Sequence, residues 1–497
     1  MANKKDLSEA QGYSRRRLVT AFSSGIPDGT ELTPKKNQTP VIVGAGLTVI
    51  AIIIGLFYGY LSPSLPDGWE NNKLVVAKTS AARYVSEDGM LHPVINAVSA
   101  QLMIPAEDFE VITVDDDQLE GIPVTSMVGI LGAPDALPER GQLVTGSLSS
   151  CTGAADALDN VLSNASSVPA PTAQGIVARV DGAEYLVTGS RRHRLPSDVT
   201  VRDEFLRALG IPQTAIVDVP VQWLNLFERG SDIAPLTFAD GEAAHVADGV
   251  QAGSIVMQED DPSETRYVVM SDGTISQLND FTYAMVSVGR GGAQAAAMPL
   301  GATVFRRLKN ADVSPLPADW PTGALTAVDA GKSMCAVLPL GSAGSVRLAV
   351  RDADAGSSGG ADSSADVRQG GGKLNMRTTF DGGTGALLRA AIGSSSAGTV
   401  FAVDSTGTAY PVPQADDEVL RRLGYSAQDV QAVPRAWADV FPTGVELTVT
   451  AAGSSPVAGS AASAAAGAAA GAAVSGADDD GSAVDGSVAD TDAREGQ

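Results

Sequence analysis

The chain has 497 residues, a formal net charge of −24 and only 5% aromatic residues. A chain of this length exceeds one simple hydrophobic core, so two or more domains are expected. Binding to nucleic acid needs clustered lysine and arginine, and so acidic a composition argues against that class of partner.

The charge is distributed unevenly around one apolar segment. Residues 1–40 carry seven basic and four acidic side chains, a net charge of +3, and include the run Arg15, Arg16 and Arg17. All later residues together carry −27. The basic run is too short to be expected to fold alone. It should therefore become ordered by docking on a cytoplasmic partner or on anionic lipid headgroups.

Residues 41–61 read VIVGAGLTVIAIIIGLFYGYL and contain no charge. A helix of this length spans roughly 30 Å, the thickness of the hydrocarbon core of a bilayer. The alternative is a cleaved signal peptide, whose apolar stretch would be about 7–15 residues long. The preceding basic residues predict a cytoplasmic N-terminus and an extracytoplasmic body.

Two glycines in this segment, Gly55 and Gly59, have the spacing that lets membrane helices approach closely. They are candidate contacts with a neighbouring helix. Glycine is also common in membrane helices that make no such contact, so both interpretations stay open.

The body contains an internal repeat with matching spacing. One copy includes Gly210 and Trp223, and the other includes Gly424 and Trp437. Each copy predicts two strands, a short helix that ends at the glycine, and a Pro–Trp turn, since glycine adopts the positive φ found at helix C-termini. The tryptophans are expected to fill the core of each unit. Two fainter copies bring the expected number of related units to four.

The predicted fold is a single transmembrane helix followed by an α+β body with a β-rich central core. The expected segments are a basic cytoplasmic segment (1–40), the membrane helix (41–61), repeat 1 (70–107), a first stretch of the central core (108–175), repeat 2 (176–240), repeat 3 (262–310), a second stretch of the central core (318–397), repeat 4 (398–450) and a disordered Ala/Gly/Asp-rich tail (451–497). Residues 355–373, rich in Gly, Ser and Asp, are expected to form a mobile insertion.

The chain has two cysteines, Cys151 and Cys335, both in the body. An even number in an oxidising compartment predicts a disulfide, with two separate buried thiols as the alternative. None of the three histidines pairs with a cysteine at a spacing typical of metal ligands, so no metal site is predicted.

Short patterns that resemble catalytic motifs lack the required context. Residues 356–360 match the G-x-S-x-G pattern but lie in low-complexity sequence. Lys332 follows a glycine and precedes a serine, as in a phosphate-binding loop, but Thr326 occupies the position of the first glycine of that loop. No catalytic residue and no cofactor site is therefore predicted.

The layout resembles the EccB component of the type VII (ESX) secretion systems of actinobacteria. The residues that carry the resemblance run from about 11 to 451 and are concentrated in 12–17, 91–96, 129–138, 192–196 and 223–225, together with the two cysteines.

This resemblance implies a structural subunit of the inner-membrane ESX core complex, accompanied by the EccC motor ATPase, EccD, EccE and further copies of itself. It also implies four repeats similar to phage-lysin cell-wall-binding folds, which makes a peptidoglycan anchor an alternative function. Some family members are labelled ATPases. An enzyme is not expected here because no Walker A motif is present, and ATP would be a cofactor only if that label held.

Overall fold

The computed structural model describes residues 4–24, 38–61, 65–153, 157–165, 174–236, 249–289, 296–312, 316–328, 331–341, 344–352, 363–365, 374–392 and 397–456. The chain divides into two units, Met1–Pro66 and Asp67–Gln497. The expected disordered tail lies outside the described residues from 457 onward.

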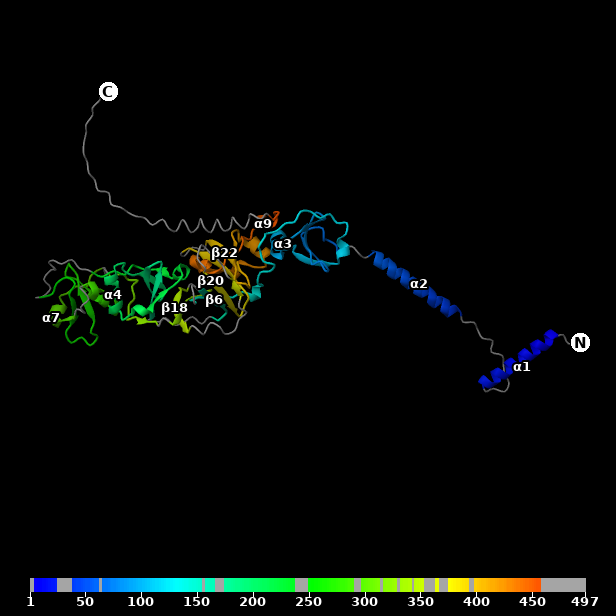
Figure 1. Cartoon of the computed structure of the whole chain (residues 1–497), viewed down its shortest axis with the longest axis horizontal. Coiled ribbons are helices and arrows are strands. Elements are labelled where there is room, and N and C mark those ends of the chain that lie inside the picture. The colour runs from blue at the N-terminus through cyan, green and yellow to red at the C-terminus, as the bar shows by residue number, and fades with distance from the viewer. Residues whose placement is uncertain are drawn as a thin grey trace, which may run out of the picture. The chain divides into compact units, whose positions relative to one another are not determined.

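The first unit contains α1 (Lys4–Ser24) and α2 (Gln38–Leu61) (Figure 1). Arg15, Arg16 and Arg17 lie within α1, whose lysine, leucine, alanine and glutamate residues are good helix formers. That this segment becomes ordered by docking on a cytoplasmic partner or on anionic headgroups stays a prediction.

In α2 the side chains are described for residues 40–56, and all of them are exposed. The apolar ones include Val41, Ile42, Leu47, Ile53 and Leu56. No helix is both long enough and apolar enough for a membrane span when only the described residues are considered.

The second unit is rich in β-structure, and four of its sheets share one topology. Three strands pair antiparallel in sequence order, a helix follows, and a fourth strand returns parallel to the first. The spatial order is therefore third, second, first, fourth in each sheet. Each such strand–strand–strand–helix–strand unit is called a repeat below.

The bounds of the four repeats are as follows. Repeat 1 comprises β1 (Lys73–Ala77), β2 (Arg83–Glu87), β3 (Met90–Pro93), α3 (Ala97–Met103) and β4 (Glu110–Val114). Repeat 2 comprises β7 (Gln174–Val180), β8 (Ala183–Thr188), β9 (Arg191–Arg194), α4 (Val199–Ala208) and β10 (Ile216–Asp218). Repeat 3 comprises β12 (Ile255–Gln258), β13 (Arg266–Val269), β14 (Ile275–Leu278), α6 (Asp280–Gly289) and β15 (Met298–Leu300). Repeat 4 comprises β21 (Ala386–Ala391), β22 (Gly398–Val403), β23 (Ala409–Val412), α8 (Asp417–Arg422) and β24 (Gln431–Pro434).

Local sequence explains why a helix follows the third strand in every repeat. An Asn or Asp side chain accepts a hydrogen bond from a backbone N–H at the start of each helix, with distances of 2.8–3.0 Å. The residues are Asn96, Asp198, Asn279 and Asp416. These are the residue types favoured at helix N-termini, because their side chains satisfy backbone donors that have no partner within the helix.

A central sheet lies between the repeats in sequence and takes strands from both sides of repeats 2 and 3. Its order is β18 (Arg347–Asp352), β17 (Lys332–Pro339), β5 (Ser147–Thr152), β6 (Ala157–Ser163), β20 (Asn375–Asp381) and β19 (Ser363–Ala365). The remaining elements are β11 (Glu228–Arg229) and β16 (Thr326–Ala327), which extend the sheet of repeat 2, and the short helices α5 (Val221–Leu224), α7 (Ala302–Phe305) and α9 (Val449–Ala452).

Three sequence-based expectations differ from this arrangement. Each repeat has three strands before its helix and one after it, whereas the sequence predicted two strands and a helix. The predicted mobile insertion contains β19, which pairs antiparallel with β20 at the sheet edge. Pairing with an edge strand uses backbone groups and needs no apolar side chains, so composition did not reveal it. Repeat 4 begins with β21, ahead of the expected boundary at residue 398. Five of the six β21 residues are buried. The strand therefore lacks the alternation of apolar and polar residues that is typical of a strand with one face in solvent.

The repeats associate in nested pairs. The helix of repeat 1 shares a buried cluster with repeat 4, in which Val98 and Leu102 meet Leu420. The helices of repeats 2 and 3 pack together, with Phe205 and Phe281 in edge-to-face contact at 6.0 Å between ring centroids. Repeat 1 therefore completes its core with repeat 4, which is distant in sequence, and repeat 2 completes its core with repeat 3.

Candidate functional site at the joints of the body

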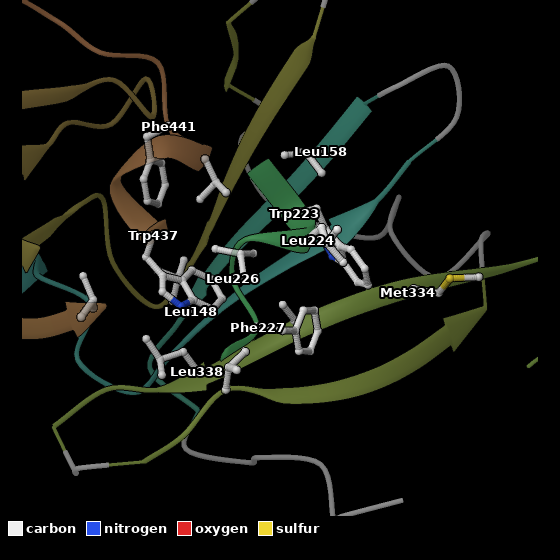
Figure 2. Packing of buried hydrophobic residues seen from close by; sticks show 14 of the residues in the cluster. Leu148, Leu158, Trp223, Leu224, Leu226, Phe227, Met334, Leu338, Trp437 and Phe441 are labelled. Atoms are coloured by element: carbon white, nitrogen blue, oxygen red, sulfur yellow. The ribbon is translucent and has the colours of Figure 1, made fainter. Parts of the chain in front are cut away.

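The two repeat tryptophans lie in one shared core. Trp223 on α5 and Trp437 on the 3₁₀ helix Arg435–Val440 are fully buried in the same cluster, together with Leu148 and Leu338 of the central sheet (Figure 2). The expectation that each tryptophan fills the core of its own unit holds only in part, because the cluster joins residues of repeats 2 and 4, such as Val187 and Leu388, to those of the central sheet. Pro220 lies two residues after β10 and Pro434 is the last residue of β24, and each is the N-cap of the short helix that carries the tryptophan.

Polar contacts fix both motifs to the central sheet. Trp223 Nε1 donates to the carbonyl oxygen of Ser150 at 3.0 Å. Asn160, which is fully buried on β6, donates from Nδ2 to the carbonyl oxygen of Val440 at 2.6 Å. A buried polar group that is satisfied in only one geometry fixes the register of the joint.

The glycines of the repeat have the backbone geometry that their positions require. Gly210 and Gly424 follow α4 and α8 with φ of +68° and +84°. In both cases the glycine N–H and the next N–H bond back to carbonyl oxygens of the last helical turn. This paired arrangement is the Schellman motif, in which a residue with a Cβ is strained.

The disulfide joins adjacent strands of the central sheet. Cys151 on β5 is directly opposite Cys335 on β17, and their sulfur atoms are bonded. Both side chains are buried, 1% and 4% exposed. The bond therefore links the two chain segments that build the central sheet on either side of repeats 2 and 3.

A connector of residues 115–143 joins repeat 1 to repeat 4. Ser99 Oγ donates to Asn96 Oδ1 at 2.7 Å and accepts from the N–H of Ile130 at 2.9 Å. Asn96 Nδ2 donates to the carbonyl oxygen of Ile130 at 2.8 Å. Gly129, with φ of +127°, packs here so closely that an added Cβ would lie 3.2 Å from the backbone nitrogen of Ile95.

The far end of the connector attaches to repeat 4. The Tyr425 hydroxyl donates to the carbonyl oxygen of Pro138 at 2.6 Å, and burial raises the pKa of this hydroxyl well above its ordinary value. Arg140 Nε lies 2.9 Å from Asp429 Oδ2. Burial alone would raise the pKa of Asp429, but hydrogen bonds from Ser426 and Arg140 outweigh it and lower the pKa.

These contacts give a structural reason for residues 91–96 and 129–138, which the sequence identified only through resemblance. Asn96 caps α3 and Gly129 admits the close approach of the connector. Ser99 and Tyr425 were missed, because a serine within a helix or a tyrosine just after one carries no pattern that reveals a distant partner.

The structure describes one of the two catalytic-like patterns, the one at Lys332. Lys332 and Ser333 begin strand β17, and Ser333 Oγ donates to the carbonyl oxygen of Thr152 at 2.8 Å, so no strand-to-helix phosphate loop exists there. Residues 356–360 lie outside the described residues. Over the described stretches of the chain, no group of three or more His, Cys, Asp or Glu residues could hold a metal ion.

A cavity of about 380 Å³ lies between α4 and α6, at the joint of repeats 2 and 3. Apolar residues such as Phe281 and Leu325 line it, and its charged residues are Glu204, Arg207 and Asp280. Two carboxylates against one arginine would repel a polyphosphate, so the cavity does not suit a nucleotide.

The remaining predicted residues lie in the first unit. Arg15, Arg16 and Arg17 are exposed on α1. An added Cβ at Gly55 on α2 would meet no atom within 4 Å, so this face has room for a neighbour. Gly59 also lies on α2.

The comparisons with known proteins agree with one another. A family model described as "Type VII secretion system ESX-1, transport TM domain B" matches residues 2–456. The "ESX-1 secretion system ATPase EccB1" of Mycobacterium tuberculosis H37Rv is 27% identical over 55% of this chain and 60% of the relative, so the chain spans less than two thirds of it. The "ESX-3 secretion system ATPase EccB3" of Mycolicibacterium smegmatis is 24% identical over 84% of this chain and 83% of the relative.

Solved structures show the same fold. One chain of an intact ESX-5 inner membrane complex aligns with a TM-score of 0.60 and 17% identity, covering 92% of this chain and 96% of that one. The EccB3 dimer from the ESX-3 core complex aligns with a TM-score of 0.60 and 22% identity, covering 77% of this chain and 99% of that one.

Proposed function

Because this chain belongs to the EccB family of type VII secretion systems, we propose that it is a structural, membrane-anchored subunit of an ESX inner-membrane complex. The observation that carries the proposal is the extent of the family match, residues 2–456, which includes the basic helix, the apolar helix and the whole described body. Export of small helical WxG-type substrates would depend on contacts that the subunit makes on both sides of the membrane.

The proposed anchor is α2. Its described side chains carry no charge and are exposed all around the helix, which is unfavourable in water and favourable in lipid. The N-terminal charge of +3 orients residues 1–40 toward the cytoplasm and the acidic body toward the periplasm.

The proposed cytoplasmic contact is α1. At about 100° per residue, Leu7, Leu18 and Phe22 fall on one side of this helix, with Arg15 and Arg17 flanking them. All three apolar side chains are exposed. An apolar stripe between basic side chains suits the surface of an anionic bilayer or an amphipathic groove on a cytoplasmic partner.

The proposed partners are EccC, EccD, EccE and other copies of this chain. Support comes from the described origin of the similar structures, an ESX-5 inner membrane complex and an ESX-3 core complex. Hydrogen bonds and shared apolar clusters hold the joints of the body, which would let the body act as a platform for such contacts.

Co-purification of the affinity-tagged full chain in detergent tests this proposal. We expect the motor ATPase and the other membrane subunits to copurify, and deletion of residues 1–38 to weaken that association while the body keeps its circular dichroism. A tagged chain that is recovered without any other membrane subunit would contradict the proposal.

ATP hydrolysis is the second candidate, because the curated relatives are named ATPases. We expect Lys332→Ala to leave secretion intact, because this residue begins a strand of the central sheet. Hydrolysis of ATP by the purified chain at a rate that Lys332→Ala abolishes would favour the enzyme.

Peptidoglycan binding is a further candidate, favoured by the four-fold repetition of one topology. Repeated modules suit a polymeric ligand, and the family resemblance of the sequence implies repeats similar to lysin cell-wall-binding folds. Sedimentation of the full chain with purified peptidoglycan, in detergent, tests it, since a structural subunit without this activity would stay in the supernatant.

A further inference from the structure

Arg351 places a positive charge against one sulfur of the disulfide. Its Nη2 lies 3.1 Å from Cys151 Sγ. Arg351 is on β18, next to β17 on the side away from β5, so the side chain reaches past Cys335 to the far sulfur. Its Nε is buried and has no hydrogen-bond partner among the described residues. Within the same described residues, no carboxylate forms an ion pair with Arg351.

A guanidinium at this distance matters only when the cysteines are reduced. A nearby arginine stabilises a thiolate and lowers the pKa of its thiol, whereas burial raises it. Both cysteines are buried, but the contact with Arg351 stabilises the thiolate of Cys151 alone. The two thiols of the reduced protein should therefore differ, although they lie opposite each other in one sheet.

Other charges on this sheet face modify the effect without reversing it. Asp159 on β6 is opposite Cys151, Arg377 on β20 is opposite Asp159, and Arg347 lies on the same strand as Arg351. Asp159 disfavours a thiolate at Cys151. Its carboxylate turns toward Gly153, where an added Cβ would lie 3.2 Å from Oδ2, whereas the Arg351 guanidinium contacts Cys151 Sγ itself.

We infer that Cys151 is the sulfur that carries the negative charge in thiol–disulfide exchange, and that Arg351 is the positioning residue that selects it. When the bond forms, the Cys335 thiolate first attacks an oxidant such as glutathione disulfide, which gives a mixed disulfide of Cys335 with glutathione and releases one glutathione thiolate. The Cys151 thiolate then attacks Cys335 Sγ, forming the Cys151–Cys335 bond and releasing glutathione thiolate. In the reverse direction an attacking thiolate bonds to Cys335, and Cys151 leaves as the thiolate beside Arg351.

The register of the central sheet makes this sequence of exchange steps possible before the disulfide has formed. Backbone pairing of β5, β17 and β18 spans five or six residue pairs on each side of β17. This pairing brings Cys151, Cys335 and Arg351 together without the covalent bond. Arg351 would therefore act during folding in the oxidising compartment, and again if a reductant opens the bond.

The test is thiolate absorbance near 240 nm, which does not depend on reagent access. The full chain in detergent is titrated from pH 4 to 9 as Cys335→Ser, which retains only Cys151, and as Cys151→Ser, which retains only Cys335. A chain with both substitutions supplies the baseline. We expect the Cys151 midpoint to lie at least one pH unit below the Cys335 midpoint, a tenfold difference in thiolate population near neutral pH.

Substitution of the arginine completes the test. Arg351→Met in the Cys335→Ser background should raise the Cys151 midpoint by about one unit or more, and Arg351→Lys should raise it less. Arg307→Met, at an exposed arginine just after α7 and outside the central sheet, is the control and should leave the Cys151 midpoint within a few tenths of a pH unit. Equal midpoints for the two cysteines would overturn the inference even if Arg351→Met failed to fold, and so would an unchanged midpoint in a folded Arg351→Met chain.

Discussion

At the residue scale, the two repeat tryptophans form a matched pair that differs in one hydrogen bond. Trp223 Nε1 donates to Ser150, whereas Trp437 Nε1 is buried without a partner among the described residues. We expect Trp223→Phe to destabilise the body by about 1 kcal/mol more than Trp437→Phe, because both lose similar volume but only the first breaks a buried hydrogen bond. Urea unfolding followed by circular dichroism measures the difference. A larger loss for Trp437→Phe would contradict the assigned contact.

A second residue-scale prediction concerns Asp429. Its folded-state pKa is lowered, so its contribution to stability is present above the unfolded-state pKa near 4 and disappears as pH falls through the folded value. We expect Asp429→Asn to lower the unfolding midpoint at pH 7 and to differ little from the parent near pH 2.

The control is Asp439→Asn. Its ion pair with Arg435 is about half exposed on both sides, so this substitution should change stability little at either pH. A loss at Asp429→Asn that persists undiminished to pH 2 would show that its charge is not the cause.

The repeat spacing predicted the glycine and tryptophan positions from the sequence, but not what the tryptophans contact. Spacing reports local structure, and Gly210 and Gly424 act locally at helix ends. The tryptophans act across the fold, on a sheet whose strands are far away in sequence. For the same reason the contacts of Asn96, Ser99 and Tyr425 could not be predicted, because their partners lie up to 287 residues away.

At the element scale, the connector between repeats 1 and 4 depends on close packing at Gly129. We expect Gly129→Ala to destabilise the body by about 1–3 kcal/mol, since it adds both a strained positive φ and a contact 3.2 Å from Ile95 N. Gly121→Ala is the matched control, because φ there is +85° and nothing lies within 4 Å of an added Cβ. Thermal unfolding should rank the two, and equal shifts would mean that packing at Gly129 contributes nothing.

Prediction of individual elements succeeded where the sequence signal is local, as at helix ends. It failed where the assignment depends on which strands pair with each other. The sequence predicts helices of repeats 2, 3 and 4 close to where α4, α6 and α8 lie. The sequence analysis assigned the residues of β21 to the central core. A strand that is buried on both faces has the same apolar pattern in the central sheet as in the sheet of repeat 4. Strand β19 has three residues and no apolar pattern, so only its backbone pairing with β20 identifies it.

At the scale of the whole molecule, the proposed orientation of the chain rests on the charge on either side of α2. A phosphatase reporter fused after residue 75 should be active in an exporting host, because that point follows α2 and precedes most of the acidic body. A reporter that works only in the cytoplasm at this site would reverse the proposed topology.

The central claim is that the chain supports secretion as a structural subunit of a membrane complex. The most direct measurement is the size of the detergent-extracted complex that contains the EccC motor ATPase, by native electrophoresis, in a strain lacking this chain. We expect the complex to be lost or much smaller, and to be restored equally by the parent chain and by Lys332→Ala. A complex of unchanged size without the chain would contradict the claim, as would one that Lys332→Ala fails to restore while its body remains folded.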